Sequence, residues 1–219
     1  MRGPFVEITN GTITPAHLNS IDSTFYVDPD GQPWMIFVNE WPNFEDKIGK
    51  MAVAKLSDDL TCLISEPIDL FKASEPKWTG GRNVTDGCFM YTTKKGSLLM
   101  IWSNFDDHGY AVGIAKSTNN KIDGKWIHED KALYSKSMNT KYDGGHGMIF
   151  TDTDGQKYLC IHTPTRHAKK EEKFLHLFRL SKKTIHLYVC FDKSISVTQK
   201  PCHRMITAAG FSLFSFMRM

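Results

Sequence analysis

The chain has 219 residues, of which 41% are apolar, 12% aromatic and 23% charged, and its formal net charge at pH 7 is +3. These values are ordinary for a globular protein, and the nearly balanced charge argues against a nucleic-acid or membrane-surface partner. The longest apolar stretch, residues 206–217, is far shorter than the roughly 20 residues that cross a bilayer, so no transmembrane segment is expected.

The N-terminal residues, MRGPFVEITNGTITP, lack the basic and then apolar pattern of a secretion signal. The sequence therefore predicts no export signal in this chain and leaves its location open. Five cysteines are widely spread, odd in number and without metal-ligand spacing. We interpret them as free thiols in the core: Cys62, Cys88, Cys160, Cys190 and Cys202.

Three segments of the chain resemble one another. They read FYVDPDGQPWMIFVNE from Phe25, FMYTTKKGSLLMIWSN from Phe89 and IFTDTDGQKYLCIHT from Ile149. Each consists of a strand, a polar turn that ends in Gly, and a second strand. The turns DPDG, TKKG and DTDG supply the Asp and Gly residues that tight hairpins need. The sequence therefore predicts three β-hairpins belonging to an internal repeat.

Further strands follow the first two hairpins. The alternating segments KMAVAKLSDDL from Lys50 and YAVGIAKSTNN from Tyr110 each lead to another strand, so a unit holds about four strands. The units recur about every 60 residues, with almost no helical period between them. This spacing favours an all-β propeller over the alternative, a β-sandwich, which has no reason to repeat one hairpin at near-constant spacing.

An ionisable residue stands three positions before the first residue of each hairpin: Asp22, Asp86 and His146. The first strand of a propeller blade lines the central channel, so equivalent positions on successive blades face one axis. The alternative is that these residues are turn residues bonded to nearby backbone N–H groups. Three of them in one register favour a shared pocket, in which Asp22 and Asp86 could cleave a glycosidic bond as a carboxyl pair.

Aromatic residues on or just beyond the same hairpins suit a sugar site, because flat rings stack on the apolar faces of sugars. Trp41 and Phe105 lie at strand ends beside polar residues, and Phe89 lies on the second hairpin. We interpret these three as candidate substrate-binding residues. Trp34 and Trp102 lie within strands and are expected in the core.

His146 stands in the segment GGHGM, where glycines at 144, 145 and 147 let the backbone approach closely and leave the imidazole little covered. A role in ligand binding or in holding a hydrated metal ion fits this exposure. The alternative is a hydrogen-bonded structural histidine that fills a narrow channel.

At these residues the sequence resembles glycoside hydrolase family 43, inverting enzymes that trim arabinose and xylose polymers on a five-bladed β-propeller. The resemblance runs from about Gly3 to about Thr165 and is carried by SIDSTFYVDPDGQPWMIF, VTDGCFMYTTKKGSLLMIWS and GGHGMIF. It implies an incomplete propeller of about three to four blades over residues 1–167. Residues 168–219 are expected as a divergent segment, either a closing set of strands or a sequence that has drifted out of selection. Family members are often extracellular or periplasmic.

The resemblance also implies roles for the three ionisable residues. Asp86 matches the general acid, Asp22 the carboxylate that tunes and orients it, and His146 a residue beside a central calcium or its water shell; no organic cofactor is implied. An ionised Asp22 would raise the pKa of Asp86 by like-charge repulsion. Most family members carry Glu at the acid position, so this chain resembles the subset with TDG.

The expected function is hydrolysis of an arabinose- or xylose-containing oligosaccharide or polysaccharide, impaired because no carboxylate matches the family's general base. Asp106 and Asp143, near the pocket rim in sequence, are candidates for a relocated base. The alternative is a non-catalytic carbohydrate-binding or scaffold propeller. A protein-interaction propeller of the kelch kind is disfavoured, because it has no use for ionisable residues in register near the axis. Open blade edges are expected to favour self-association.

Overall fold

The computed structural model describes residue 4 and residues 6–138, 141–164, 174–181 and 188–198. Its strands form three antiparallel four-stranded sheets, each ordered as in the chain. The first sheet consists of β1 (Ser20–Val27), β2 (Pro33–Asn39), β3 (Lys50–Lys55) and β4 (Ile68–Lys72). The second consists of β5 (Asp86–Thr92), β6 (Leu98–Asp106), β7 (Gly109–Ser117) and β8 (Trp126–His128). The third consists of β9 (Gly145–Thr151), β10 (Lys157–Thr163), β11 (Phe174–Ser181) and β12 (Tyr188–Thr198).

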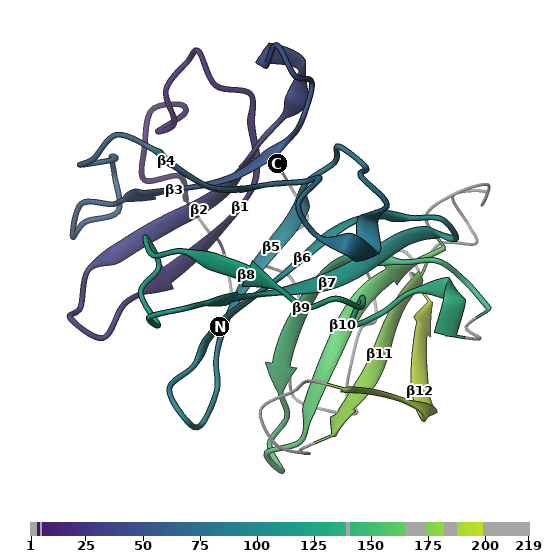
Figure 1. Ribbon diagram of the computed structural model, residues 1–219. Helices are drawn as coiled ribbons and strands as arrows, with labels where there is room; N and C mark the ends of the chain where they lie inside the picture. Colours follow the sequence, from purple (N-terminus) through teal and green to yellow (C-terminus); the bar gives the residue numbers. More distant parts are fainter. Residues whose placement is uncertain (1–3, 5, 139–140, 165–173, 182–187, 199–219) are drawn as a thin grey trace.

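The sheets follow one another in space as they do in the chain, from purple through teal to green (Figure 1). The first strands of the sheets are neighbours, with β5 in contact with both β1 and β9. Short 3-10 helices lie in three connections: η1 (Trp41–Asn43), η2 (Lys77–Thr79) and η3 (Lys136–Met138). Successive four-stranded sheets that meet at their first strands are the blades that the sequence repeat predicts.

The three predicted hairpin turns form as their residues require. Asp28 Oδ1 accepts hydrogen bonds from the backbone N–H groups of Asp30 and Gln32, at 3.0 and 2.9 Å. Asp152 bonds the backbone of its own turn in the same way. The glycine that ends each turn has a positive φ, which a residue without a Cβ adopts readily: Gly31 (87°), Gly96 (82°) and Gly155 (76°).

Two apolar layers hold the sheets together. One, between the first and second sheets, includes Trp34, Met51 and Trp102; Trp34 and Trp102 are thus in the core, as expected. The other, between the second and third sheets, includes Ile101 and Leu159. Apolar side chains therefore cover both faces of the second sheet, and this packing holds the first and third sheets in place against it.

Part of the segment expected to diverge after residue 167 forms strands of the third sheet. Strand β11 pairs with β10 from Tyr158 to Thr163, and β12 pairs with β11. These strands complete the third blade, as the closing-strand alternative proposed. They were missed because the segment FLHLFRLS matches none of the three repeated hairpins. Residues 199–219 of the expected segment lie outside the described residues.

Among the cysteines whose side chains the structure describes, Cys88 and Cys160 are buried free thiols, as expected. Cys62 is free but exposed, so its assignment to the core is wrong. Burial raises the pKa of the Cys88 thiol to about 12, which leaves it an unreactive core group. The side chains of Cys190 and Cys202 lie outside the described part. Among the described residues, no helix has the length and apolar character needed to cross a membrane.

Candidate active site

Each inner strand is interrupted by a bulge near its start. The residue with a left-handed backbone there is Asp22 in β1 (φ 53°), Gly87 in β5 (43°) and His146 in β9 (49°). Asp86 is the residue before this position, so the expected register of Asp22, Asp86 and His146 is off by one in β5. A left-handed backbone strains a residue other than glycine, and a bulge re-aims side chains. The strained backbone therefore occurs at two of the candidate residues, Asp22 and His146.

Asp22 lies between the other two inner strands. Its Oδ2 atom accepts a hydrogen bond from the backbone N–H of Gly87 at 3.3 Å and lies 3.6 Å from Nδ1 of His146. The His146 side chain is 48% exposed and that of Asp22 24%, so both are open to solvent to some extent. A Cβ on Gly87 would lie 2.7 Å from Cα of His146, so the absence of a side chain lets these strands approach. The structure therefore brings Asp22, His146 and the start of β5 together.

Asp86 is held between a tyrosine and a second carboxylate. The Tyr110 hydroxyl donates a hydrogen bond to Asp86 Oδ2 at 2.9 Å. Burial raises the pKa of Asp86 to about 7; the bond from Tyr110 lowers that pKa, whereas the negative charge of Asp22 and a hydrogen bond with it raise it further. The charge of Glu40 also raises the pKa of Asp86. Such a carboxyl is partly protonated near neutral pH and can donate a proton.

The candidate aromatic residues occupy three different surroundings. The Phe105 ring packs on Tyr110 with 5.0 Å between ring centres, so it borders the Asp86 pocket. Trp41 begins η1 directly after Glu40, whose charge acts on Asp86. Phe89 instead packs against the apolar cluster between the second and third sheets. The structure does not bring Phe89 to the carboxyl groups, because the bulge shifts the pairing of β5 between Asp86 and Phe89.

Both candidates for a relocated base are tied to neighbouring loops. Asp143 is only 8% exposed, and its Oδ2 accepts the backbone N–H of Tyr110 at 3.1 Å. The Asp106 carboxylate accepts hydrogen bonds from the hydroxyl of Ser135 and from the backbone N–H of His108. These bonds give each carboxylate a role in holding the chain around Tyr110 and the β6–β7 turn.

A calcium ion would find few protein ligands near His146. Among the described residues, no three His, Cys, Asp or Glu side chains are arranged to hold a metal ion. The Asp22 carboxylate already accepts a backbone hydrogen bond, and the second ring near His146 is that of His162, 6.3 Å away between centres. Calcium prefers six to eight oxygen ligands, so these side chains do not by themselves make a calcium site.

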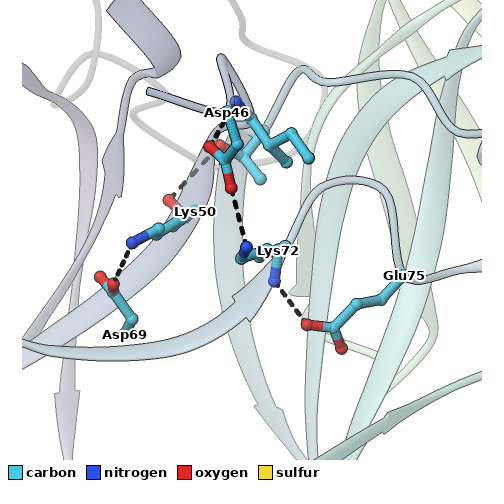
Figure 2. Close-up of polar contacts among 7 residues, drawn as sticks. Asp46, Lys50, Asp69, Lys72 and Glu75 are labelled. Atoms are coloured by element: carbon cyan, nitrogen blue, oxygen red, sulfur yellow. Dashed lines mark hydrogen bonds and ion pairs between the residues drawn. The ribbon is translucent and has the colours of Figure 1, made fainter. Parts of the chain in front are cut away.

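An open surface pocket lies at the connection between β2 and β3. It has a volume of about 360 Å³ and is lined by Phe44, Glu45, Asp46 and Lys50. Figure 2 shows the ion pairs that hold this connection to β4: Lys72 with Asp46 and Lys50 with Asp69, both at 2.7 Å. The hydrogen bond from Lys72 lowers the pKa of Asp46, which keeps that carboxylate ionised. These charged side chains lie at the surface, and an ionised carboxylate such as Asp46 has no proton to donate as a general acid.

Sequence reasoning missed Tyr110, Gly87 and Glu40 at this site. Gly87 had a usable signal, because a glycine next to a candidate acid at the start of a strand suggests a bulge. Tyr110 and Glu40 had none: each stands at the edge of an ordinary strand, and only the packing of the sheets brings it toward Asp86.

Comparison with known proteins identifies relatives of the same architecture. A family model described as "Glycosyl hydrolases family 43" matches residues 1–182. An endo-arabinase from Bacteroides thetaiotaomicron VPI-5482 is 35% identical, with a TM-score of 0.69, and the match covers 79% of this chain and 61% of that one. An endo-1,4-beta-xylanase from the same organism is 24% identical, with a TM-score of 0.73 and coverage of 90% and 66%.

A thermostable family-43 glycoside hydrolase is 21% identical, with a TM-score of 0.70, and the match covers 89% of this chain and 64% of that one. The chain thus spans between 61% and 66% of the length of these three solved structures. A comparison with curated proteins found no match. The two structures under 25% identical indicate a shared fold.

Proposed function

The chain belongs to glycosyl hydrolase family 43 and its three blades are part of a β-propeller of that family, and from this premise we propose that its axial pocket binds an arabinose- or xylose-containing saccharide. In this proposal Asp86 is the general acid of an inverting glycosidase site and Asp22 is the carboxylate that tunes it. The observation that carries the proposal is the hydrogen bond from the backbone of Gly87, next to Asp86, to the Asp22 carboxylate, together with the raised pKa of Asp86, about 7.

The placement of Asp22 supports an acid with a tuning partner. Its Oδ2 atom accepts a hydrogen bond from the backbone N–H of Gly87, the residue after Asp86, at 3.3 Å, and its negative charge raises the pKa of Asp86. A neighbouring charge of this kind helps an acid to stay protonated near neutral pH when it is paired with a separate base. Asp22 therefore acts on Asp86 in this proposal and does not attack the substrate.

Trp41, Phe105 and His146 are proposed to contact the saccharide. Phe105 borders the pocket through Tyr110, and His146 is the most exposed of the polar groups there. Phe89 is not carried forward, because it packs in the apolar layer between two sheets. A hydrated calcium near His146 stays a proposal, in which water supplies most of its ligands, and no step depends on it.

We propose that hydrolysis by residues 1–219 is weak. An inverting site needs a base that deprotonates water on the face opposite the acid, and the general base that the family resemblance implies has no matched carboxylate in the three described blades. General acid or base assistance is typically worth about 10² to 10⁴-fold in rate. The expected result is saccharide binding with little turnover.

The test combines a binding titration with arabino- and xylo-oligosaccharides and kinetics on the same substrates. Binding with slow cleavage is expected, and added azide should accelerate the cleavage. In this reaction an azide nitrogen forms a bond to the sugar carbon, the bond from that carbon to the leaving oxygen breaks, and the Asp86 proton passes to the leaving oxygen. Asp86→Asn should abolish this azide-dependent cleavage and keep binding. A scaffold propeller, the alternative function, would bind saccharide and show no cleavage with azide.

Robust turnover without azide would contradict the proposed impairment. Turnover lost in Asp86→Asn and in one of Asp106→Asn, Asp143→Asn or Glu40→Gln would place a working base within the chain. Glu40 joins this set because its charge already acts on Asp86. If no oligosaccharide binds at millimolar concentration, the saccharide proposal itself fails.

Self-association through open blade edges is also proposed, and exposed apolar residues on β1, the edge strand of the first sheet, support it. Tyr26 packs toward the layer between the first two sheets, so its neighbours Phe25 and Val27 lie on the opposite face of β1. They are 49% and 47% exposed. Light scattering across a concentration series should show a rising mean mass, reduced in Phe25→Thr. A constant monomer mass would exclude this association.

A further inference from the structure

Tyr110 is the most firmly fixed side chain around the acid. It is 3% exposed, and its backbone N–H donates to the buried carboxylate of Asp143 at 3.1 Å. Its ring stacks on His162 with 5.6 Å between centres and 28° between planes, while Phe105 covers another side. A Cβ on Gly145 would collide with the Tyr110 ring, so β9 closes against it. The ring therefore has one position, and its hydroxyl a fixed direction.

A series of polar groups leads to this hydroxyl. The backbone N–H of His146 can only donate, and it donates to Ser103 Oγ at 2.9 Å. The Ser103 hydroxyl lies behind Tyr110 and lowers the pKa of that tyrosine, as a hydrogen-bond donor does. The Tyr110 hydroxyl donates to Asp86 Oδ2 at 2.9 Å. The polar groups therefore follow one another from a backbone amide through Ser103 and Tyr110 to the carboxyl group.

We propose that Tyr110, oriented by Ser103, is a positioning residue that occupies Asp86 Oδ2 as an acceptor and so leaves the proton to be carried on Oδ1. This inference rests on the proposed role of Asp86 as general acid. One oxygen is committed to the Tyr110 hydroxyl, and the carboxyl plane is held by that bond. The other oxygen is then the one that carries the proton and can donate it to a glycosidic oxygen.

The hydrogen bond from Tyr110 shifts the pKa of Asp86 in the direction opposite to the other causes. Burial and the charge of Asp22 raise the pKa of Asp86, whereas the bond from Tyr110 lowers it. Tyr110 itself stays protonated, because burial and the nearby Asp86 hold its pKa well above the usual range. It can therefore donate throughout the working range and does not serve as a base. The balance keeps a buried acid able to release its proton near neutral pH.

The test measures the titration of Asp86 directly, by the carboxyl-carbon NMR signal of 13C-aspartate-labelled protein. Tyr110→Phe keeps the stacked ring and removes only the hydroxyl. Its Asp86 pKa should rise by about one pH unit, a tenfold change in the protonation equilibrium. Ser103→Ala should raise the Asp86 pKa less, because the Tyr110 hydroxyl remains and loses only its Ser103 neighbour. Tyr134→Phe is the matched control: this buried tyrosine donates to the Tyr142 carbonyl, and its loss should leave Asp86 unchanged.

An Asp86 titration that is unchanged in folded Tyr110→Phe overturns the inference. If circular dichroism shows that this variant is unfolded, an unchanged titration in Ser103→Ala overturns it instead. Oligosaccharide titration of the unaltered protein separates this result from the proposed function. Failure to bind sugar rejects the saccharide site and leaves the Tyr110 effect standing, whereas sugar binding with an unchanged titration rejects only the role of Tyr110.

Discussion

Two groups of carboxylates in this protein show how surroundings decide chemistry. Asp86, in the pocket, is enclosed by strands and faces Asp22, and its pKa is raised to about 7. Asp46, on the β2–β3 connection, is at the surface and accepts a hydrogen bond from Lys72, which lowers its pKa (Figure 2). Both residues are aspartates, but Asp86 is buried beside a negative charge, whereas Asp46 is exposed beside a positive one. Asp86 stays protonated near neutral pH because it is buried, and the neighbouring negative charge raises its pKa further.

The close approach of the inner strands should be the feature most sensitive to change. Gly87→Ala places a methyl group 2.7 Å from Cα of His146 and forces a side chain onto a backbone with φ of 43°. Stability should fall by about 2 kcal/mol or more in urea denaturation, because β5 must shift. Gly31→Ala is the control: its φ is 87° but nothing lies within 4 Å of the added Cβ, so about 1 kcal/mol is expected. Equal losses in both variants would mean that the approach to His146 is not tight.

The contribution of Asp86 to stability should fall as pH rises from about 4 to about 7, whereas His128, whose pKa is lowered by burial to about 4, contributes in the opposite direction. The unfolded chain releases the Asp86 proton near its ordinary pKa of 3.8, whereas the folded protein holds it to about 7. The folded state therefore binds more protons in this window, and its advantage is lost as pH rises through it. The loss is of the order of 2 to 4 kcal/mol. The difference in unfolding free energy between the unaltered protein and Asp86→Asn, measured by urea denaturation across the window, should change with pH by this amount; a difference that does not depend on pH would mean that Asp86 titrates at its ordinary pKa.

Asp22→Asn should lower the pKa of Asp86 by removing the opposing negative charge while keeping a side chain of the same shape. The decrease should be partial, because burial, the largest cause of the raised pKa, remains. Carboxyl NMR titration measures it. Asp46→Asn serves as the control, since that carboxylate pairs with Lys72 at the surface. An Asp86 pKa that is unchanged by Asp22→Asn would break the comparison between the two groups.

Calcium should stabilise the protein modestly if a hydrated ion lies by His146. At ten times its dissociation constant a ligand contributes about 1.4 kcal/mol, which raises the melting temperature of a domain of this size by a few degrees. His146→Ala should remove this increase. Identical melting curves in calcium and in chelator would leave His146 as a structural residue of the channel.

The surface ion pairs should matter least. Lys72→Met removes the partner of Asp46, and exposed pairs of this kind contribute little to stability. Its melting temperature should match that of the unaltered protein within error, and the Asp86 titration should not move. A clear loss of stability would show that the β2–β3 connection depends on this pair more than its exposure suggests.

Much of the architecture follows from local sequence rules. The turns at Asp28 and Asp152 formed because Asp and Gly satisfy the backbone of a tight hairpin wherever they occur. The tryptophans Trp34 and Trp102 are buried because they stand within apolar strands that pack between the first two sheets. The proximity of Asp22 and His146 followed from the repeat, because equivalent positions of successive blades meet at the axis.

Other features were set by tertiary structure alone. The bulge in β5 places Asp86 one residue away from the position that the repeat predicted, and it leaves Phe89 in the core. Strands β11 and β12 joined the third blade by pairing with β10 and with each other, although their sequence matches none of the repeated hairpins.

The sequence by itself determined the blades, their hairpins and the residues that face the axis, because these depend on side-chain period and turn chemistry within a few residues. Tertiary structure decided the chemistry of the site. The pKa of Asp86 depends on burial, on a carboxylate from another blade and on the Tyr110 hydroxyl, which only packing brings to it. Charge energies change with distance and local dielectric, and neither is written in the order of residues along the chain.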